Sequence, residues 1–304
     1  MQFIQKYLRI ARESFSVLLS VNKTLDDIKI NQGRILAELQ QRKVSENLQD
    51  YEFKVFSQWG EDGMLQRLTQ ILDIPNKTFI EFGVEDFLES NCRFLLMKDN
   101  WQGFVIDGSE HNINRLKKSY FYWGTHLEAV HSFVTRENIN ALLHQSGFDP
   151  DLGILSIDLD GVDYYVLEAI DFFKPRILVC EYNAVLGGDR KISVPYRPDF
   201  QRTKAHYSNL YWGASLLAMT HLAEKKGYVL VGTTTARNNA FYVRRDLLNG
   251  QLQVLSARKA YAPSHARESR DSDGRLTFLS GDKRLDVIKG LPVVDIETGV
   301  TIPL

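Results

Sequence analysis

The sequence of 304 residues has few cysteines, no long apolar run and almost no net charge, and each absence excludes a class of protein. Cys92 and Cys180 each lie among apolar residues, which predicts buried reduced thiols, fits a cytoplasmic protein and leaves no cysteines for a zinc site. The 37 basic and 38 acidic residues nearly cancel, so the charge does not favour nucleic acid as a partner. No stretch approaches the roughly 20 apolar residues that span a bilayer, and the first ten residues lack the pattern of a signal peptide. We therefore expect a soluble protein.

Residues 1–50 contain no proline and one glycine, which favours one long helix. Apolar residues recur there at alternating spacings of three and four, as in the a and d positions of a heptad frame. They are Ile4, Tyr7, Ala11, Leu18, Val21, Leu25, Ile28, Ile35 and Leu39, with Ser14 and Gln32 as polar interruptions. This seam predicts self-association through a coiled coil. The alternative is an amphipathic helix that packs on its own domain or lies on a membrane surface, as in a peripheral protein of the inner membrane.

From Tyr51 onward the sequence alternates between strand and helix patterns. The predicted strands are Thr78–Phe82, Gly103–Ile106, Leu127–Val134, Leu152–Ile157, Arg176–Cys180, Gly227–Val231 and Ala240–Val243. The predicted helices are Met64–Leu72, Leu88–Lys98, Ile113–Tyr120, Arg136–Gln145, Tyr164–Phe173 and Gly213–Lys226. Five βα units in series predict a parallel sheet covered on both faces, and the last two strands suit an antiparallel edge pair. We expect an α/β domain over residues 51–250 and a C-terminal arm, residues 251–304, that packs on it.

Acidic residues follow the predicted strands at the ends where ligands bind in open α/β sheets. After the first strand, Gly83 allows a tight turn beside a ligand, and Glu81 would orient the loop or accept from an amine. The second strand leads into Asp107, Gly108 and Ser109, and Asp107 lies 26 residues after Glu81, where an acid often bonds ribose hydroxyls. The alternative is that Asp107 or Ser109 caps the next helix. The glycines of a dinucleotide fingerprint are absent, which disfavours a pyrophosphate ligand.

Three acids, Asp158, Asp160 and Asp163, follow the fourth predicted strand. Carboxylates gathered in one place repel one another unless a cation, a hydroxyl or a proton uses them. The fifth strand leads into Glu181 and Asn183 and should lie beside the fourth, which predicts a site of hard oxygen ligands for Mg²⁺ or Mn²⁺. The predicted metal ligands are Asp158, Asp160, Glu181 and Asn183. The alternatives are a helix N-terminal charge for Asp163 and loop hydrogen bonds for Glu181 and Asn183.

His206 lies in the loop between the fifth strand and the long helix that precedes the edge pair, where a substrate lid would lie. A histidine with a pKa near neutrality there could act as a general base. The alternative is a solvated loop histidine. We expect Asp158 and Asp160, with His206, to carry the chemistry.

Several segments together resemble one family. They are Phe79–Asp86, Glu89–Leu96, Val105–Ser109, Ser156–Tyr164, Cys180–Ala184 and Gly213–Leu216. They are similar to the FkbM-like S-adenosylmethionine-dependent methyltransferases, in particular to a branch associated with bacterial surface-polysaccharide biosynthesis. The resemblance covers about residues 55–250 and implies a Rossmann-like methyltransferase fold, S-adenosylmethionine as cofactor and a sugar or glycan acceptor methylated on oxygen.

The resemblance also implies where the cofactor binds. Glu81, Gly83 and Asp107 would hold it, and Gln58 with Asp62 would close over its methionine end. The predicted site further includes Glu85, Gly108, Ser109 and Asp158. Glu85 departs from the family pattern, because a second glycine is common at that position.

Two other functional classes compete with this interpretation. One is a glycosyltransferase in which Asp158-Leu159-Asp160 holds a metal ion and a sugar diphosphate. The other is a non-catalytic assembly protein of polysaccharide synthesis, organised by the N-terminal helix.

Overall fold

The protein was analysed as a computed structural model that describes residues 2–304. Within its first helix, the described side chains are those of residues 5–7, 9, 17 and 20 onward. The heptad positions Ile4, Ala11, Ser14 and Leu18 therefore lie outside the described side chains.

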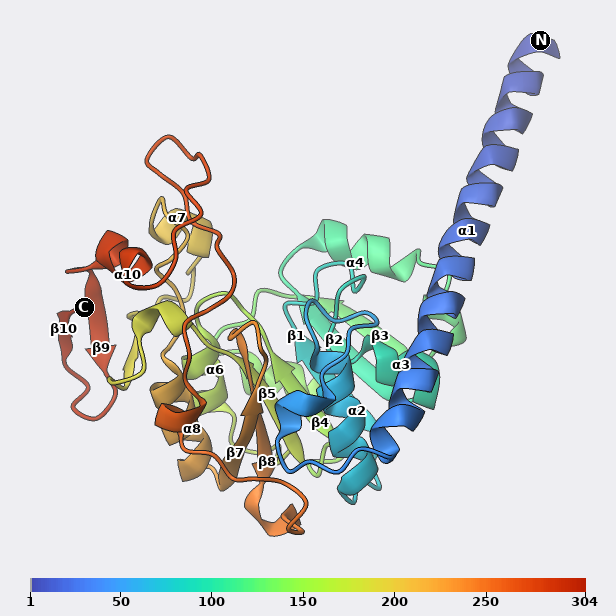
Figure 1. The fold of residues 1–304 in the computed structure, drawn as a ribbon. Helices are drawn as coiled ribbons and strands as arrows, with labels where there is room; N and C mark the ends of the chain where they lie inside the picture. The colour runs from blue at the N-terminus through green and yellow to red at the C-terminus, as the bar shows by residue number, and fades with distance from the viewer. Residues whose placement is uncertain (1) are drawn as a thin grey trace.

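A seven-stranded sheet forms the centre of the described chain (Figure 1). Its strands are β1 (Thr78–Phe82), β2 (Gln102–Asp107), β3 (Leu127–His131), β4 (Ile154–Ile157), β5 (Ile177–Glu181), β7 (Tyr228–Thr233) and β8 (Asn239–Arg244). The strand order is β3-β2-β1-β4-β5-β8-β7, and β8 runs antiparallel to both of its neighbours while the pairs from β3 to β5 are parallel. This order, with a hairpin at one edge, confirms the predicted Rossmann-like methyltransferase fold.

Helices cover both faces of the sheet, as the crossover connections of a parallel sheet require. They are α2 (Glu61–Ile71), α3 (Arg93–Asp99) and α4 (Glu110–Lys117) on one face, and α5 (Ile139–Gln145), α6 (Asp163–Ala169) and α8 (Leu216–Lys225) on the other. Side chains alternate between the faces: Phe79 packs under α2 and α3, while Ile80 and Phe82 belong to the opposite core. Because both faces are buried, the strands are continuous apolar runs.

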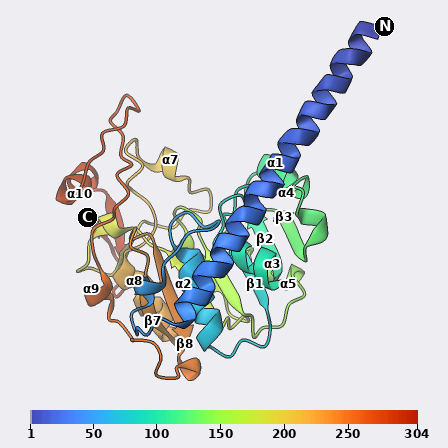
Figure 2. The ribbon, with the colours of Figure 1, turned by 45° about the vertical axis from the view of Figure 1, so that its right-hand side comes forward.

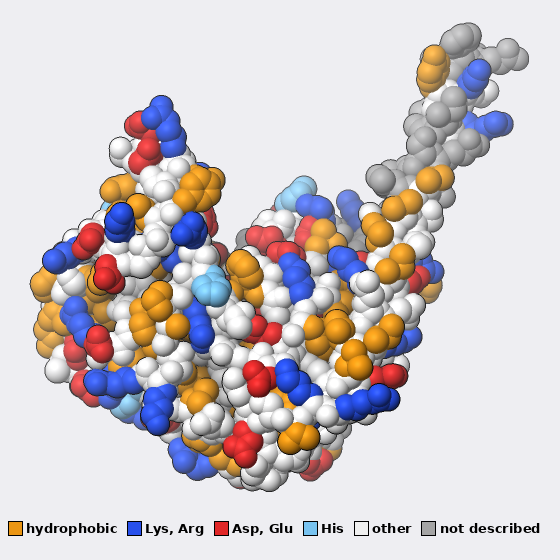
Figure 3. Space-filling model, in the orientation of Figure 1, with side chains coloured by type: hydrophobic (Ala, Val, Ile, Leu, Met, Phe, Trp, Pro, Cys, Tyr) orange, Lys and Arg blue, Asp and Glu red, His pale blue; other side chains and the backbone are white. Residues whose placement is uncertain are grey.

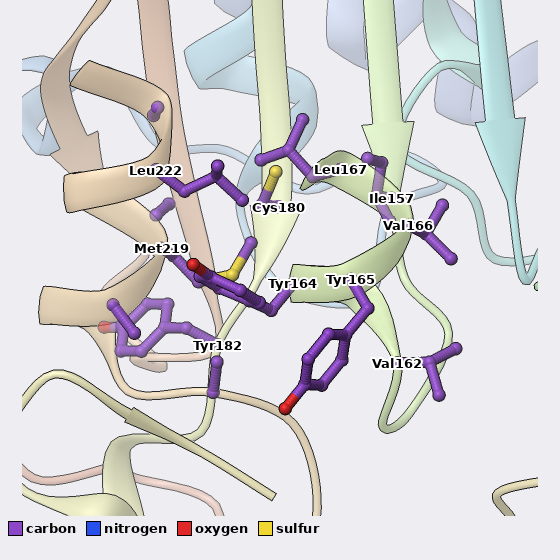
Figure 4. Packing of buried hydrophobic residues seen from close by; sticks show 14 of the residues in the cluster. Ile157, Val162, Tyr164, Tyr165, Val166, Leu167, Cys180, Tyr182, Met219 and Leu222 are labelled. Carbon is purple, nitrogen blue, oxygen red and sulfur yellow. The ribbon is translucent and has the colours of Figure 1, made fainter. Parts of the chain in front are cut away.

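The core under α6 and α8 is drawn in Figure 4, where Met219 and Leu222 of α8 lie close to Cys180 of β5 and Tyr164 of α6. Cys92 and Cys180 are both buried and free, which confirms the prediction of reduced thiols. Among the described residues, no helix combines the length and apolar composition needed to cross a bilayer.

The first helix, α1 (Gln2–Gln41), rises away from the body of the molecule in both ribbon views (Figures 1 and 2). Its C-terminal half packs on the domain, where Ile30 and Ala37 are buried and Gln40 donates to the carbonyl groups of Tyr51 and Gly63. Gly33 is required by this close packing, since a Cβ there would lie 2.5 Å from the ring of Phe94.

The remaining α-helices and strands all follow β5 in the chain. They are α7 (Arg202–Ala205), α9 (Ala257–Ala260), α10 (Asp282–Ile288), β6 (Ile192–Ser193), β9 (Pro292–Asp295) and β10 (Thr301–Pro303). Strands β6, β9 and β10 form a small antiparallel sheet. Ala257, Ala260, Ile288 and Val293 join the core of the main domain, so residues 251–304 extend that core.

Candidate functional site

Two adjoining cavities lie at the carboxyl ends of the central strands, where β1 and β4 flank the point at which strand order reverses. The first, here the nucleoside cavity, has a volume of about 390 Å³. The second, here the acidic cavity, has a volume of about 200 Å³. Gly83, Glu85, Asp158 and Asp160 line both cavities, so a ligand group in one can reach the other.

The nucleoside cavity contains most of the residues predicted to bind the cofactor. Its lining includes Gly83, Glu85, Asp107, Gly108, Ser109 and Asp158. Asp107 is buried, and its two oxygens accept from the backbone N–H groups of Glu85 (2.8 Å) and Ser109 (2.7 Å). A carboxylate oxygen has two lone pairs, so Asp107 keeps acceptor capacity toward hydroxyl groups. The hydroxyl of Ser109 caps α4 by accepting from the N–H of Asn112, as the alternative interpretation predicted.

Gly83 and Glu85 shape the turn between the two cavities. Gly83 has φ +70°, and a Cβ there would lie 1.7 Å from the carbonyl oxygen of Asp158. Glu85 has φ +48°, a left-handed conformation that favours glycine. Burial, followed by the charge of Asp107, raises the pKa of Glu85.

The acidic cavity is lined by six carboxyl groups and one guanidinium. The acids are Glu81, Glu85, Glu89, Asp158, Asp160 and Glu181, and the remaining polar residues are Gln58, Ser90, Asn91, Arg202 and Asn239. The guanidinium of Arg202, from α7, pairs with Asp160 (2.9 Å) and with Glu268 (3.4 Å). A surplus of negative charge therefore lines the cavity.

Asp158 and Glu181 form a buried carboxyl pair at the ends of the neighbouring strands β4 and β5. Burial raises the pKa of each well above its ordinary value; the charge of Asp160 adds to the rise at both residues, and the charge of Asp158 adds to it at Glu181. Raised pKa values favour the protonated form, so the pair can hold a proton and exchange it with a ligand.

Glu81 and Asp62 are anchors of loops. Glu81 accepts from the hydroxyl of Ser90 (2.7 Å) and from the N–H groups of Asn91 (2.8 Å) and Cys92 (3.1 Å), and thus fixes the loop that precedes α3. One oxygen of Asp62 accepts from the hydroxyl of Ser57 (2.8 Å) and from three successive N–H groups of residues 55–57, each at 2.7 Å. Burial raises the pKa of Asp62 to about 6.

Gln58 lines the acidic cavity, whereas Asp62 lines neither cavity. Asp62 affects the cavity indirectly, because its hydrogen bonds fix the turn that carries Gln58.

Two predicted site residues are corrected by the structure. Asn183 is not available as a metal ligand: its side-chain oxygen accepts from the N–H of Val185 (2.9 Å), and its amide nitrogen donates to the carbonyls of Leu210 and Trp212 (both 2.9 Å). His206 lines neither cavity; its ring bonds the hydroxyl of Ser208 (2.8 Å), and burial lowers its pKa. Its ring is therefore not among the groups that the structure brings to the two cavities.

The predicted metal centre has no counterpart among the described residues, in which no group of three or more His, Cys, Asp or Glu side chains has the arrangement of a metal site. Asp160 is engaged by Arg202, and Asn183 by backbone groups. The set of four hard oxygen ligands therefore does not converge.

Other lining residues escaped the sequence analysis. Ser132 and Phe133 follow β3 and line the nucleoside cavity, and Asn239, at the start of β8, lines the acidic cavity. Phe133 was predicted inside the strand Leu127–Val134, whereas β3 ends at His131 and leaves Phe133 in the loop at the strand end. The sequence offered no signal for Asn239, because its place in the site depends on the pairing of β8 with β5.

No protein-family model matches the sequence, and no curated protein matches it. Solved structures similar to this chain include an S-adenosylmethionine-dependent methyltransferase from Aquifex aeolicus (11% identity, 59% of this chain and 88% of that chain, TM-score 0.34). Another is such an enzyme from Clostridium acetobutylicum (8%, 70% and 96%, TM-score 0.37). A third is an O-methyltransferase family protein from Burkholderia thailandensis (10%, 61% and 58%, TM-score 0.37). At these identities and scores we draw nothing about activity from them, and the fold rests on the strand order itself.

Proposed function

We propose that the protein is an S-adenosylmethionine-dependent methyltransferase that methylates a hydroxyl group of a sugar or a related acceptor. The observation that carries this proposal is the pair of adjoining cavities. One cavity has an acid suited to ribose at the end of β2, and the other has a proton-holding carboxyl pair at the ends of β4 and β5. Gly83 and Asp158 stand between them, where a methyl group would pass.

The residues fit the cofactor in three respects. Asp107 keeps acceptor capacity toward the ribose hydroxyls, Phe133 offers an aromatic wall, and Gly83 allows close approach of the backbone. Bound S-adenosylmethionine supplies an electrophilic methyl group on a sulfonium. The ionised member of the pair formed by Asp158 and Glu181 would take the proton that the acceptor hydroxyl loses. A metal ion remains a weaker proposal, since Asn183 is not free to bind one.

Isothermal titration with S-adenosylhomocysteine tests this function directly. We expect saturable binding in the micromolar range that Asp107→Ala weakens at least about tenfold, the effect of losing roughly one charge-assisted hydrogen bond. Asp107→Asn, which keeps one acceptor oxygen, should lose less. Absence of binding to the wild type at millimolar concentration would refute the proposal.

The competing glycosyltransferase hypothesis has less support, because Asp160 of its Asp-x-Asp pair bonds Arg202. Thermal unfolding discriminates between the two functions. Protection by a nucleotide sugar with Mn²⁺, and none by S-adenosylhomocysteine, would favour glycosyl transfer.

We further propose that α1 joins two copies of the chain. The residues of its predicted seam that the structure describes are turned away from the domain: Val21, Leu25, Ile28, Ile35 and Leu39 are each 45–60% exposed. In Figure 3, hydrophobic side chains lie along the lower part of this helix, next to the body of the molecule. The domain is contacted by other positions, such as Ile30 and Ala37, so the seam is left for a partner helix.

Sedimentation of the full chain tests this second proposal. A double substitution Leu25→Glu and Ile28→Glu should convert an oligomer into a monomer, while Lys23→Glu, outside the seam, should not. A wild type that sediments as a monomer and binds anionic vesicles instead would favour a role on a membrane surface.

A further inference from the structure

Two buried acceptor atoms in the acidic cavity have no hydrogen-bond partner. One is Oε2 of Glu181 and the other is Oδ1 of Asn239; the two residues are 8% and 2% exposed. A buried acceptor without a donor is costly, so most such atoms in native proteins bond a ligand or water. Both residues line the same cavity.

The orientation of Asn239 is fixed by Glu61, a fully buried residue of α2. The amide nitrogen of Asn239 donates to Oε1 of Glu61 (2.9 Å), while Oε2 of Glu61 accepts from the N–H of Trp59 (2.9 Å). Because a carboxylate only accepts, the amide nitrogen must face Glu61, and the amide oxygen is left for another donor. The atom of Asn239 that lacks a hydrogen-bond partner is therefore the acceptor Oδ1.

The two acceptors are direct neighbours across the sheet. Glu181 ends β5, Asn239 begins β8, and the two residues are paired in the antiparallel register. The Cβ atoms of such a pair lie about 4.5–5.5 Å apart, so one small group can bond both side chains. That group needs at least two donors. A hydroxyl has one, whereas a primary ammonium has three.

The charges that line the acidic cavity also favour an ammonium group. Five further carboxyl groups line the cavity, and its one guanidinium, on Arg202, is already paired with Asp160 and Glu268. An ammonium would be attracted by this lining, and its hydrogen bonds to Glu181 would be charge-assisted. A divalent metal ion fits less well, because the described residues contain no converging set of metal ligands.

We infer that the methyl acceptor carries a protonated primary amine, which docks between Glu181 and Asn239 beside the hydroxyl to be methylated. This inference rests on the proposed function only in taking the ligand to be a methyl acceptor. The substrate class is that of amino alcohols and amino sugars. Glu181 and Asn239 lie on strands β5 and β8, on the far side of β4 from the ends of β1 and β2 that carry Gly83 and Asp107.

The test compares two probes of equal size, ethanolamine and ethylene glycol, which differ in one amine. Binding of each to the full chain is measured by saturation-transfer NMR titration, with and without saturating S-adenosylhomocysteine. Ethanolamine should bind at least about tenfold more tightly than ethylene glycol in both conditions, since charge-assisted bonds are roughly twice as strong as neutral ones. Glucosamine and glucose form a second matched pair with the same expected order.

Substitutions of two cavity residues test whether the amine binds at Glu181. Glu181→Gln should remove the preference for the amine and leave the affinity for S-adenosylhomocysteine within about twofold. Glu89→Gln removes a carboxylate at the rim of the same cavity, one that is exposed and paired with Lys54, and should change neither binding constant by more than about twofold. Circular dichroism of both variants establishes that they are folded.

Three results would overturn the inference. The first is equal binding of amine and diol. The second is loss of S-adenosylhomocysteine binding in Glu181→Gln together with exclusion of ethanolamine from the cofactor complex, which would assign the subsite to the methionine end of the cofactor. The third is displacement of ethanolamine by millimolar MgCl₂ that itself binds more tightly. Failure of the proposed function is distinct: S-adenosylhomocysteine would not bind, whether or not the amine does.

Discussion

Substitution of Gly83 by alanine tests how the two cavities are held together. A Cβ at this position would lie 1.7 Å from the carbonyl oxygen of Asp158, a separation that must grow to at least 3.0 Å. The ends of β1 and β4 would have to move apart by at least 1.3 Å. Since both residues line both cavities, this movement would distort the cofactor site and the acidic cavity together.

The expected loss has two parts. An alanine at φ +70° adopts a left-handed conformation, which costs roughly 1–2 kcal/mol of conformational free energy. Overpacking of a closed interior adds typically about 1–3 kcal/mol. We therefore expect Gly83→Ala to lower the free energy of unfolding by about 3 kcal/mol and to weaken S-adenosylhomocysteine at least about tenfold, measured by urea denaturation and by isothermal titration.

Gly147→Ala is the matched control. Gly147 has φ +64°, and no atom lies within 4 Å of the position that its Cβ would take. This variant should show the backbone penalty alone, about 1–2 kcal/mol, with unchanged ligand affinity. Equal losses of stability in the two variants, or full cofactor affinity in Gly83→Ala, would refute the argument from close approach.

Three further predictions follow from buried polar groups. Asp62→Ala should lower the free energy of unfolding by about 3 kcal/mol or more, because four donors lose their shared acceptor, and Asp62→Asn should lose less in the same urea titration. Arg93→Met removes the cation paired with Asp26, which keeps the hydrogen bond from the hydroxyl of Tyr120, and should cost about 3 kcal/mol. Lys54→Met, in an exposed ion pair, should cost less than about 1 kcal/mol, and similar costs for the two variants would contradict the role of burial. Burial raises the pKa of Asp158, so its contribution to stability is present below the unfolded pKa of about 3.9 and is lost as pH rises through the folded pKa. Asp158→Asn should therefore gain stability relative to the wild type as pH rises above about 4, and a difference that stays constant as pH rises would count against the prediction.

The sheet could be predicted from the sequence because its strands are buried on both faces and read as continuous apolar runs. Helix starts were less accurate. The helix predicted from Leu88 begins only at Arg93, since the carboxylate of Glu81 holds residues 90–92 in a loop. The helix predicted from Gly213 begins at Leu216, after the cap formed by Ser215.

The site was predictable only to the level of strand ends. Parallel topology brings Glu81, Asp107 and Asp158 to one edge of the sheet, and the sequence order of the strands was enough to expect this. Which lone pairs remain free was not predictable. The amide nitrogen of Asn183 donates to carbonyl groups 27 and 29 residues further along the chain. Asp62 accepts from the backbone of a turn that no hydrophobic periodicity indicates.

The acidity of the site carries a conformational cost that supports a functional role. Glu85 and Asp160 adopt left-handed conformations, with φ +48° and +52°, at positions where glycine would fit without strain. Each such residue costs of order 1 kcal/mol, and this cost is found mainly where a side chain serves a ligand. Both side chains line the two cavities, and neither belongs to the apolar core that stabilises the fold. Negative charge at this edge of the sheet therefore opposes stability locally, which is expected of a surface shaped for a cationic ligand.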